Sequence, residues 1–378
     1  MIKPLFKYTG GKFKEYQYFK EFIPKTINNY YEPFLGGGGV LFQLINDKRV
    51  NGICFGNDIS NDLINFYNNV SNKKTLQEMM KLAECWEEMK KIADDVYDKI
   101  GYEFYGIAIK KLDNDILPDE TIKALLDKLC NENKKLKEYN YHNVSLADKL
   151  EAELKSKLNR FKRKEEIENE GMKLVETCIK TSILQGFYFV IRDLYNNGMF
   201  DKKGEYTTEE KCAHWYFIRE FAFGGMFRFS SDGRFNIPYG GASYNDKCID
   251  CKIKKIMGKE VQNSLKKIEF FNEDFETFMK REYKENDFIF LDPPYDSTFT
   301  EYDNTEFGRE EHIRLRDLLC NIECKWLLII RETDFIKEIY KDYIKGSFDK
   351  KYQYQARGTY DAKDSVHLII SNYNLNDI

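Results

Sequence analysis

The sequence has no apolar run of about 18 to 20 residues, the length that a membrane-spanning helix needs. Its first residues, MIKPLFKYTGGK, also lack the apolar core of a signal peptide. The nine cysteines are an odd number scattered along the chain, which is typical of reduced thiols in a reducing compartment. Together these absences predict a cytoplasmic protein without a membrane partner.

Histidine is scarce, and no arrangement of Ser/His/Asp or Cys/His residues suggests nucleophilic catalysis. The four isolated residues are His142, His214, His312 and His367. A four-thiolate zinc site could be formed by two cysteine pairs, Cys248/Cys251 and Cys320/Cys324. However, no histidine accompanies either pair, and Cys320 and Cys324 lie one helical turn apart, so ordinary thiols are favoured and no metal is predicted.

Charge of one sign does not dominate, since 59 basic and 63 acidic residues give a net charge of −4. This balance neither favours nor excludes nucleic acid as a partner. The 42% hydrophobic and 15% aromatic content is enough for a sizeable core. A length of 378 residues suggests a core domain with a second domain or a large insertion.

Two regions, about 28–70 and 267–373, alternate short apolar segments with helical patterns, which predicts a parallel-rich α/β sheet with covering helices. Expected helices follow in GGGVLFQLIND, SNDLINFYNNV (with Ser60 as cap), GREEHIRLRDLLCN and TDFIKEIYKDY. Expected strands are NNYYEPF, VNGICFGND, IEFFNEDF, DFIFLDPPY, KWLLIIRE, KKYQYQARG and SVHLIISNY.

The region between them, about 73–210, is charged and helical by pattern and is broken only by Pro118. It contains a basic stretch from Lys149 to Lys164. A solvated helical hairpin is the favoured interpretation of most of these charges. A face that touches phosphates stays open for the NRFKRK end.

A glycine turn lies in EPFLGGGGVLF, residues 32–42, where a strand pattern changes to a helix pattern. Glycines let the chain turn sharply and let a ligand approach without a clash with Cβ. Asp58, at the end of the next strand, lies 22 residues after Gly36 and suits an acid bonded to ribose hydroxyls. Dinucleotide enzymes and S-adenosylmethionine enzymes both use this combination, and a plain glycine-rich turn is the alternative.

The segment LDPPYD, residues 291–296, follows an apolar run directly. An amino group on an aromatic ring is a poor nucleophile because its lone pair is delocalised. The Asp292 carboxylate and the Pro293 carbonyl could accept its two N–H bonds, since the prolines restrict the backbone. Tyr295 offers a flat face for a base that has left the duplex. The alternative is a proline turn after a strand with a chance acid.

The chain resembles the Dam-type (class alpha) family of DNA adenine-N6 methyltransferases in four motifs, which occur in the order FKYTGGK, EPFLGGGG, ND at 57–58 and LDPPY. The segment at 223–240 resembles that family's hairpin, NEDF its short acid-Phe motif, and WLLIIRETD and VHLIISNY its C-terminal strands. The resemblance covers roughly residues 3–70 and 212–373. It implies a Rossmann-like S-adenosylmethionine-dependent methyltransferase sheet with helices on both faces, plus a mostly helical target-recognition domain with a β-hairpin.

The resemblance therefore predicts a catalytic domain in two parts, 1–72 and 266–378, interrupted by a helical insertion and DNA target-recognition region at 73–265. The implied reaction transfers a methyl group from S-adenosyl-L-methionine to N6 of a flipped-out adenine in double-stranded DNA, with S-adenosyl-L-homocysteine as product. A cognate restriction endonuclease is left open as a partner. The alternatives are a methyltransferase on another planar amine, such as N4-cytosine or RNA adenine, and a catalytically silent DNA-binding relative.

The resemblance also assigns site residues by matching positions. Many family members have Trp at the position of Tyr8, and Lys12 could also pair with the cofactor carboxylate. The implied catalytic residues are Asp292, Pro293, Pro294 and Tyr295. The implied cofactor-binding residues are Tyr8, Gly11, Lys12, Glu32, Phe34, Gly36, Gly38, Asp58, Asp274, Phe275 and Asp292. The hairpin residues expected to contact DNA, where Arg suits guanine and Asn suits adenine, are Arg228, Ser230, Arg234 and Asn236.

Overall fold

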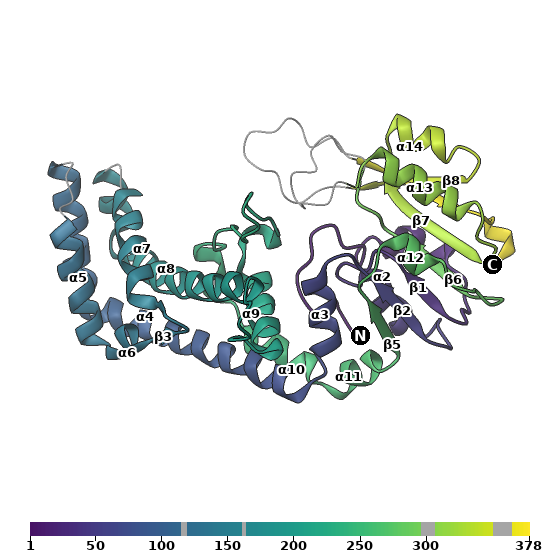
Figure 1. Cartoon of the computed structure of the whole chain (residues 1–378). Coiled ribbons are helices and arrows are strands. Elements are labelled where there is room, and N and C mark those ends of the chain that lie inside the picture. The colour runs from purple at the N-terminus through teal and green to yellow at the C-terminus, as the bar shows by residue number, and fades with distance from the viewer. Residues whose placement is uncertain (115–118, 161–163, 296–306, 351–364) are drawn as a thin grey trace. The chain divides into compact units, whose positions relative to one another are not determined.

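The alternating apolar segments form one seven-stranded sheet in the computed structural model, which describes residues 1–114, 119–160, 164–295, 307–350 and 365–378 (Figure 1). The strand order is β5-β2-β1-β6-β7-β9-β8. Adjacent strands from β5 to β7 are parallel, whereas β9 is antiparallel to both β7 and β8. The strands are β1 (Tyr30–Glu32), β2 (Cys54–Asn57), β5 (Ile268–Phe271), β6 (Phe288–Leu291), β7 (Lys325–Arg331), β8 (Ile344–Lys350) and β9 (Ser365–Ser371). The predicted mixed α/β fold with a mostly parallel sheet is thereby confirmed.

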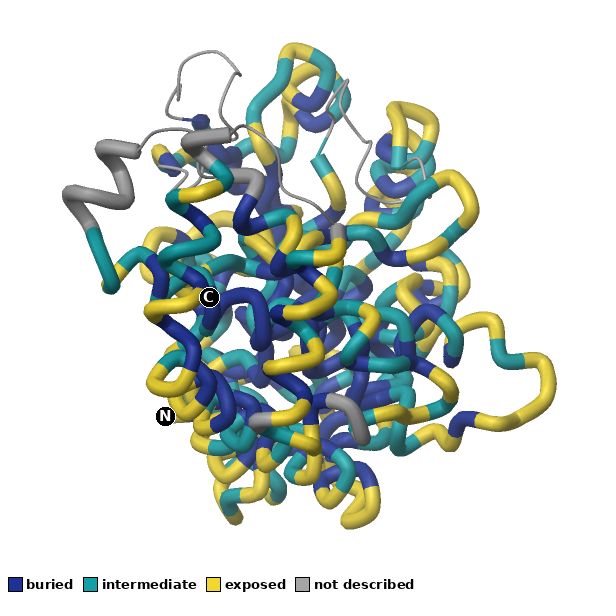
Figure 2. Tube along the Cα trace, turned by 90° about the vertical axis from the view of Figure 1, so that its left-hand side faces the viewer, coloured by how far each residue is buried: buried dark blue, intermediate teal, exposed yellow. Residues whose placement is uncertain are grey.

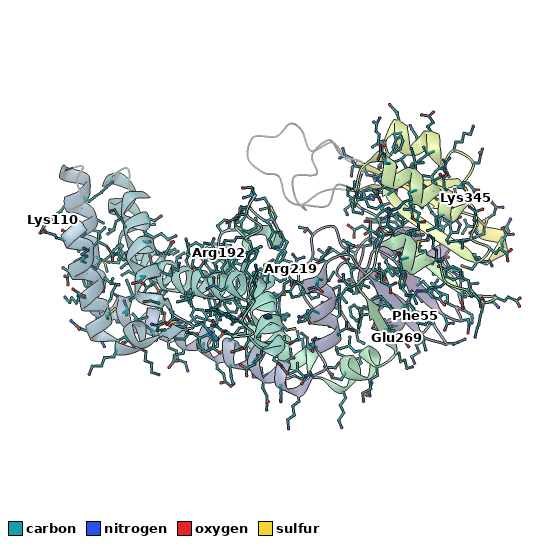
Figure 3. The ribbon with its side chains drawn as sticks, viewed as in Figure 1. Phe55, Lys110, Arg192, Arg219, Glu269 and Lys345 are labelled. Atoms are coloured by element: carbon teal, nitrogen blue, oxygen red, sulfur yellow. A yellow bond between two sulfur atoms is a disulfide. The ribbon has the colours of Figure 1, made fainter. Side chains whose placement is uncertain are left out.

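The unbroken apolar composition of the central strands explains their position in the sheet. All four residues of β6 are buried, as are five consecutive residues of β7, from Trp326 to Ile330. Such unbroken apolar runs are typical of strands covered on both faces. Figure 2 shows buried residues in dark blue along the Cα trace. Farther out, Phe55 of β2 lies opposite Glu269 of β5, and both residues are labelled in Figure 3.

Strand β1 lies at the point where the chain changes direction across the sheet. From β1 the chain passes through α2 (Gly39–Asn46) to β2 on one side, and from β6 it passes through α13 (Arg309–Leu319) to β7 on the other side. Right-handed crossovers in opposite directions place their helices on opposite faces of the sheet. The loops at the carboxyl ends of β1 and β6 therefore meet at a switch point, where α/β sheets bind ligands.

The predicted helices form, with two differences in detail. Ser60 is the N-cap of α3 (Asn61–Asn69), but its side chain makes no capping bond; instead the Asp58 carboxylate accepts from the Ser60 N–H at 2.9 Å. The strand expected at 350–358 lies outside the described residues except for Lys350, which is the last residue of β8; the sequence did not predict the strand at Ile344–Lys350. The other helices that accompany the sheet are α1 (Tyr16–Phe19), α11 (Lys259–Leu265), α12 (Phe275–Met279) and α14 (Asp334–Ile339).

The described chain divides into two units. Unit 1 contains the sheet and comprises Met1–Ser71, Met226–Phe229 and Lys254–Ile378; unit 2 comprises Asn72–Gly225 and Ser230–Ile253. The expected catalytic parts, 1–72 and 266–378, and the expected recognition region, 73–265, stay predictions. Within unit 1, α11 leads directly into the sheet, where the Lys267 carbonyl accepts from the Cys54 N–H at 3.0 Å.

Unit 2 is mostly helical. Its core contains Trp86, which packs against Phe187, Phe217 and Phe221 from two other helices. The basic end at 159–164 lies outside the residues whose side chains are described. The elements are α4 (Lys73–Asn114), α5 (Asp119–Glu132), α6 (Lys134–Glu138), α7 (Leu146–Arg160), α8 (Lys164–Met199), α9 (Thr208–Phe221) and α10 (Ile249–Ile256), with a small ribbon of β3 (Asn140–Tyr141) and β4 (Val144–Ser145).

One segment of α8 has the length and composition of a membrane span. The helix Gly171–Met199 has a mean hydropathy of 1.3 in its most apolar window. Within the structure 61% of that window is buried, and its Phe187 contacts the rings of Trp86 and Phe217. A core helix of a folded unit passes the same test by composition, so the absence of a membrane partner stays a prediction.

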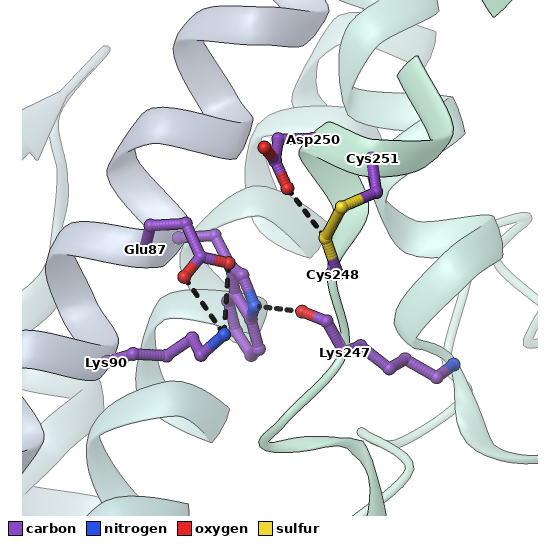
Figure 4. The surroundings of a disulfide bond; sticks show 7 residues. Glu87, Lys90, Lys247, Cys248, Asp250 and Cys251 are labelled. Carbon is purple, nitrogen blue, oxygen red and sulfur yellow. Dashed lines mark hydrogen bonds and ion pairs between the residues drawn. A yellow bond between two sulfur atoms is a disulfide. The ribbon is translucent and has the colours of Figure 1, made fainter. Parts of the chain in front are cut away.

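Cys248 and Cys251 are joined by a disulfide at the start of α10, so the prediction of reduced thiols is wrong for this pair (Figure 4). Their Cα atoms are 5.6 Å apart, a separation that a disulfide can bridge. The preceding carbonyl, of Lys247, accepts from the buried Trp86 indole N–H at 3.1 Å, which fixes the approach to the pair. With Asp250, the two sulfur atoms form the one close group of metal-ligand atoms found among the described residues, but the S–S bond removes both thiolates.

Candidate active site

The glycine turn after β1 makes room for the N-terminal motif. A Cβ at Gly36 would lie 2.7 Å from Cε1 of Tyr8, and a Cβ at Gly37 would lie 2.8 Å from Cβ of Tyr8. Gly36 also has a φ of +48°, which favours glycine. A Cβ at Gly39 would lie 2.8 Å from the Phe13 backbone nitrogen. The sequence predicted a turn that a ligand approaches closely; in this structure the close neighbour is the protein's own FKYTGGK segment.

Asp58 holds this turn from the other side. Its Oδ2 accepts from the Gly36 N–H at 2.9 Å, and its Oδ1 accepts from the Ser60 N–H at the same distance. The Tyr67 hydroxyl donates to the Gly36 carbonyl at 3.3 Å. The acid and the glycine turn, 22 residues apart in the sequence, are therefore in direct contact at the carboxyl ends of neighbouring strands. The assignment of Asp58 to the ribose stays a prediction.

Asp292 follows β6 and forms a buried ion pair with Lys12. The Lys12 ammonium donates to Asp292 Oδ1, to the Tyr295 hydroxyl oxygen at 3.1 Å and to the Gly10 carbonyl at 3.4 Å. The Lys12 side chain is 1% exposed and that of Asp292 is 19% exposed. The Lys12 ammonium thus joins two members of the DPPY motif. Its predicted place in the cofactor site stays a prediction.

The charge of Asp292 depends on this pairing. Burial raises the pKa of the Asp292 carboxyl, because a carboxylate loses hydration energy, and the Lys12 ammonium opposes that rise. Without a cation in contact, the carboxyl would be driven further toward its protonated form. Lys12 therefore favours the ionised form of Asp292, and a carboxylate can accept two N–H bonds or one strong hydrogen bond.

Glu32, the last residue of β1, is 2% exposed. Burial raises the pKa of its carboxyl well above the usual value, while the Tyr30 hydroxyl, which donates to Oε2 at 2.9 Å, opposes the rise. Asp292 and Asp58 add negative potential that raises the pKa of Glu32 further. This carboxyl is consequently suited to a protonated state or to a cationic neighbour.

Asp274 caps α12 and is held by an arginine. Its Oδ1 accepts from the Glu276 N–H at 3.0 Å, and its Oδ2 accepts from Arg314 Nη2 at 2.5 Å. The same guanidinium lies 4.3 Å from the centre of the Phe275 ring. The acid-Phe motif is therefore clamped from α13, and Arg314 is a residue that sequence reasoning missed.

Three aromatic rings meet beside this acid. The ring centres of Phe34 and Phe275 are 5.5 Å apart, and Phe307 lies 5.5 Å from Phe34 and 5.6 Å from Phe275. Phe34 and Phe275 were expected to border the cofactor, and the structure brings them together. Phe307 was missed, because it precedes a helix without any motif around it.

The segment expected as a β-hairpin, at 226–240, has little regular pairing among the described residues. Its turn is closed by the Ser230 N–H, which donates to the Arg234 carbonyl at 2.8 Å. The Ser230 hydroxyl donates to the same carbonyl at 2.9 Å, so it stabilises the turn. The Arg234 guanidinium lies 5.4 Å from the Phe200 ring centre. Arg228 is exposed and Asn236 is half-buried.

Side chains of α8 hold part of the second arm of this segment. Buried Asn196 accepts from the Phe235 N–H at 2.8 Å and donates to the Phe235 carbonyl at 3.1 Å. The Tyr188 hydroxyl donates to the Ile237 carbonyl at 2.9 Å. These bonds satisfy backbone groups of the second arm. Its end is also paired through the backbone, since the Phe223 N–H donates to the Pro238 carbonyl and the Gly240 N–H to the Phe221 carbonyl, both at 2.9 Å, beside the isolated bridge from Ala222 to Tyr239.

The fold and site together define a class of enzyme. A mostly parallel sheet carries a glycine turn and an acid after two neighbouring strands, and an Asp-Pro-Pro-Tyr segment after the strand across the switch point. This combination is that of a methyltransferase that takes its methyl group from S-adenosylmethionine.

The sequence matches the family of D12 class N6 adenine-specific DNA methyltransferases over residues 8–355, and the chain belongs to that family. The predictions of a Dam-type family and of a DNA adenine-N6 methyltransferase are confirmed. The predicted absence of a metal, and the role of each site residue, stay predictions.

Three relatives illustrate the similarity. The chain is 35% identical over 165 residues to the type II methyltransferase M.CviBI of Paramecium bursaria Chlorella virus NC1A, covering 43% of this chain and 61% of that relative. It is 23% identical to type II methyltransferase M1.LlaDCHI of Lactococcus lactis subsp. cremoris, covering 98% and 96%. It is also 23% identical to type II methyltransferase M.MjaIII of Methanocaldococcus jannaschii, covering 98% and 99%. Similarity to the last two therefore extends through the helical region.

Proposed function

We propose that this chain methylates N6 of an adenine that has been flipped out of double-stranded DNA, with S-adenosyl-L-methionine as the methyl donor. The observation that carries the proposal is the buried contact of Lys12 with Asp292 and Tyr295 at the end of β6. It joins the acid and the aromatic ring of the DPPY motif in one rigid group.

The target amino group would be bound by two acceptors. The bond from Lys12 uses Asp292 Oδ1, so Oδ2 and the Pro293 carbonyl would accept the two N–H bonds of the adenine. Pro293 and Pro294 restrict the backbone that carries this carbonyl. These two bonds would take the nitrogen lone pair out of conjugation with the ring, and the amino group would then be nucleophilic. A proton is lost after transfer, to water or to Asp292.

Tyr295 would bind the flipped base through its ring. Its hydroxyl oxygen accepts from Lys12 at 3.1 Å, and this bond limits rotation and tilting of the side chain. A planar base stacked on the ring would lie with its amino group near Asp292. Stacking of this kind is worth about 1–3 kcal/mol per base.

The residues that follow β1, β2 and β5 would bind the methyl donor. Its positive sulfonium supplies an activated methyl group, so the chain need only bind and orient it. Asp58 would accept from ribose hydroxyls, the Phe34 and Phe275 rings would border the adenine beside Asp274, and Glu32 would meet the methionine ammonium. Tyr8, Gly11, Gly36 and Gly38 would line the same site. We propose no metal, because the sulfonium already activates the leaving group.

DNA would be bound by the segment at 226–240. Arg228, Arg234 and Asn236 have side chains suited to base edges in the major groove, and Ser230 would act by shaping the turn. The names of the type II relatives support a further proposal, that a cognate restriction endonuclease acts on the same DNA site. The chain would then act in the cytoplasm, where its substrate lies.

The test is transfer of labelled methyl from S-adenosylmethionine to mixed duplex DNA, followed by nuclease digestion and identification of the methylated base. We expect N6-methyladenine, and no loss of activity in the presence of EDTA. Asp292→Ala should bind the donor but transfer no methyl. Label in N4-methylcytosine, label in RNA only, or donor binding without any transfer by the unaltered chain would refute the proposal.

A further inference from the structure

His367 lies in the middle of β9 and is completely buried. Its ring centre is 5.4 Å from that of Tyr295, and the two rings are at 84° to one another. Nothing in the isolated histidine of VHLIISNY indicated this contact, because β9 and the DPPY motif are far apart in the sequence.

The imidazole is itself supported from behind. Phe348, its neighbour across the β8–β9 pair, has its ring centre 5.5 Å from that of His367. Phe348 in turn stacks on Tyr18 at 5.2 Å and contacts Phe19 at 6.1 Å, both from α1. A continuous row of rings thus connects the catalytic tyrosine to the helix that follows the Lys12 segment.

The charges that surround His367 favour its neutral form. Lys12, Lys350 and Arg331 are the cations that lower its pKa, together with burial, which is the largest cause. Lys350 is paired with Glu15 at 3.0 Å, and Lys12 is paired with Asp292. A neutral imidazole offers an aromatic edge or face, as phenylalanine does, and its positive ring edge suits the face of another ring.

We propose that His367 is a positioning residue for Tyr295: it holds the tyrosine ring at a right angle, while Lys12 holds the hydroxyl, so that one ring face is presented to the flipped adenine. The inference rests on the proposed function of Tyr295. Two separated supports, one on the ring and one on the hydroxyl, fix a side chain that has only two rotatable bonds. The sheet strand β9 supplies the rigidity, since both its neighbours are paired to it.

The experiment compares His367→Leu, which keeps much of the volume but removes the ring, with His367→Phe, which keeps a ring edge. Single-turnover methyl transfer is measured on a duplex whose methylated adenine has been mapped. 2-Aminopurine fluorescence is measured on a second duplex of the same sequence, in which 2-aminopurine replaces that adenine. Phe348→Leu is the matched control, because it disturbs the same row of rings one step away from Tyr295.

We expect His367→Leu to lower the single-turnover rate about tenfold, with little change in the Kd for S-adenosylmethionine, and to give brighter 2-aminopurine because the flipped base is stacked less well. We expect His367→Phe to restore the rate to within about threefold, and Phe348→Leu to have a smaller effect than His367→Leu. Equal rates for His367→Leu and the unaltered chain would overturn the inference, and so would an equally slow His367→Phe variant. Failure of the proposed function is separate, since the unaltered chain would then transfer no methyl at all.

Discussion

The pair of Lys12 and Asp292 allows a quantitative prediction about stability. Lys12→Met leaves a buried carboxylate without its cation, and Asp292→Asn leaves a buried ammonium without its anion. Breaking a buried pair by removal of one partner costs about 3–5 kcal/mol. Because the Asp292 side chain keeps 19% exposure, we expect the lower end, about 3 kcal/mol, for Lys12→Met.

The double variant should cost less than the sum of the single variants, since it leaves no unpaired charge. We expect a coupling energy of roughly 2–3 kcal/mol, well above the additive limit of about 0.5 kcal/mol. Urea unfolding followed by circular dichroism measures all four proteins of the cycle. The control cycle uses Lys337 and Glu332, which are paired at 2.8 Å but 46% and 31% exposed. We expect no measurable coupling in this exposed pair, because solvent screens it.

The pH dependence of the same variant has a defined sign. Because burial raises the folded-state pKa of Asp292, its contribution to stability is greatest below the unfolded pKa and decreases as the pH rises through the folded value. Lys12→Met raises that pKa further, so this variant should lose stability more steeply with rising pH than the unaltered chain. Additive single effects, or parallel pH curves, would contradict the account of Lys12 as the group that keeps Asp292 ionised.

Three further predictions concern other residues. Gly36→Ala should lower the unfolding free energy by roughly 2–4 kcal/mol in a urea titration, because of its φ of +48° and the 2.7 Å approach of Tyr8; Tyr8→Ala in the same chain should recover part of the loss. Burial lowers the pKa of His214 to about 4, so stability should fall by about 2–3 kcal/mol as the pH drops from about 6.5 toward 4, and His214→Phe should flatten that slope. Denatured protein without reductant should titrate with seven thiols, which are the nine cysteines less the bonded pair, and nine thiols would show that the pair is reduced. Cys248→Ser should lower the unfolding free energy by at most about 2 kcal/mol, because the loop that the disulfide closes is short.

The site was predictable as far as its chemistry depends on neighbours in the sequence. A glycine turn, an acid 22 residues later and an acid before two prolines each carry a local reason for their residue types. Arg314 and Phe307 could not be found in this way. They reach Asp274 and Phe275 only because α13 packs beside α12, and no local pattern marks either residue.

The expectation that all cysteines are reduced failed for one pair. The Cys248–Cys251 bond depends on the geometry of the first turn of α10, whereas the expectation rested on the number and spread of cysteines along the whole chain. The β-hairpin expected at 226–240 stays a prediction. What the sequence did not indicate is that α8 binds the second arm of this segment through Asn196 and Tyr188, because those bonds depend on tertiary packing.

The sequence by itself determined the class of protein, most of the segments that form strands, and the acid and aromatic residue of the DPPY segment. These features depend on residue type and on short spacings. Tertiary structure alone decided what Lys12 and His367 do. Folding brings the N-terminal segment and β9 to the end of β6, where a buried ammonium meets a carboxylate and an imidazole meets a tyrosine ring. Contacts between residues about 280 and 70 positions apart are set by the packing of the sheet, which no local pattern in the chain records.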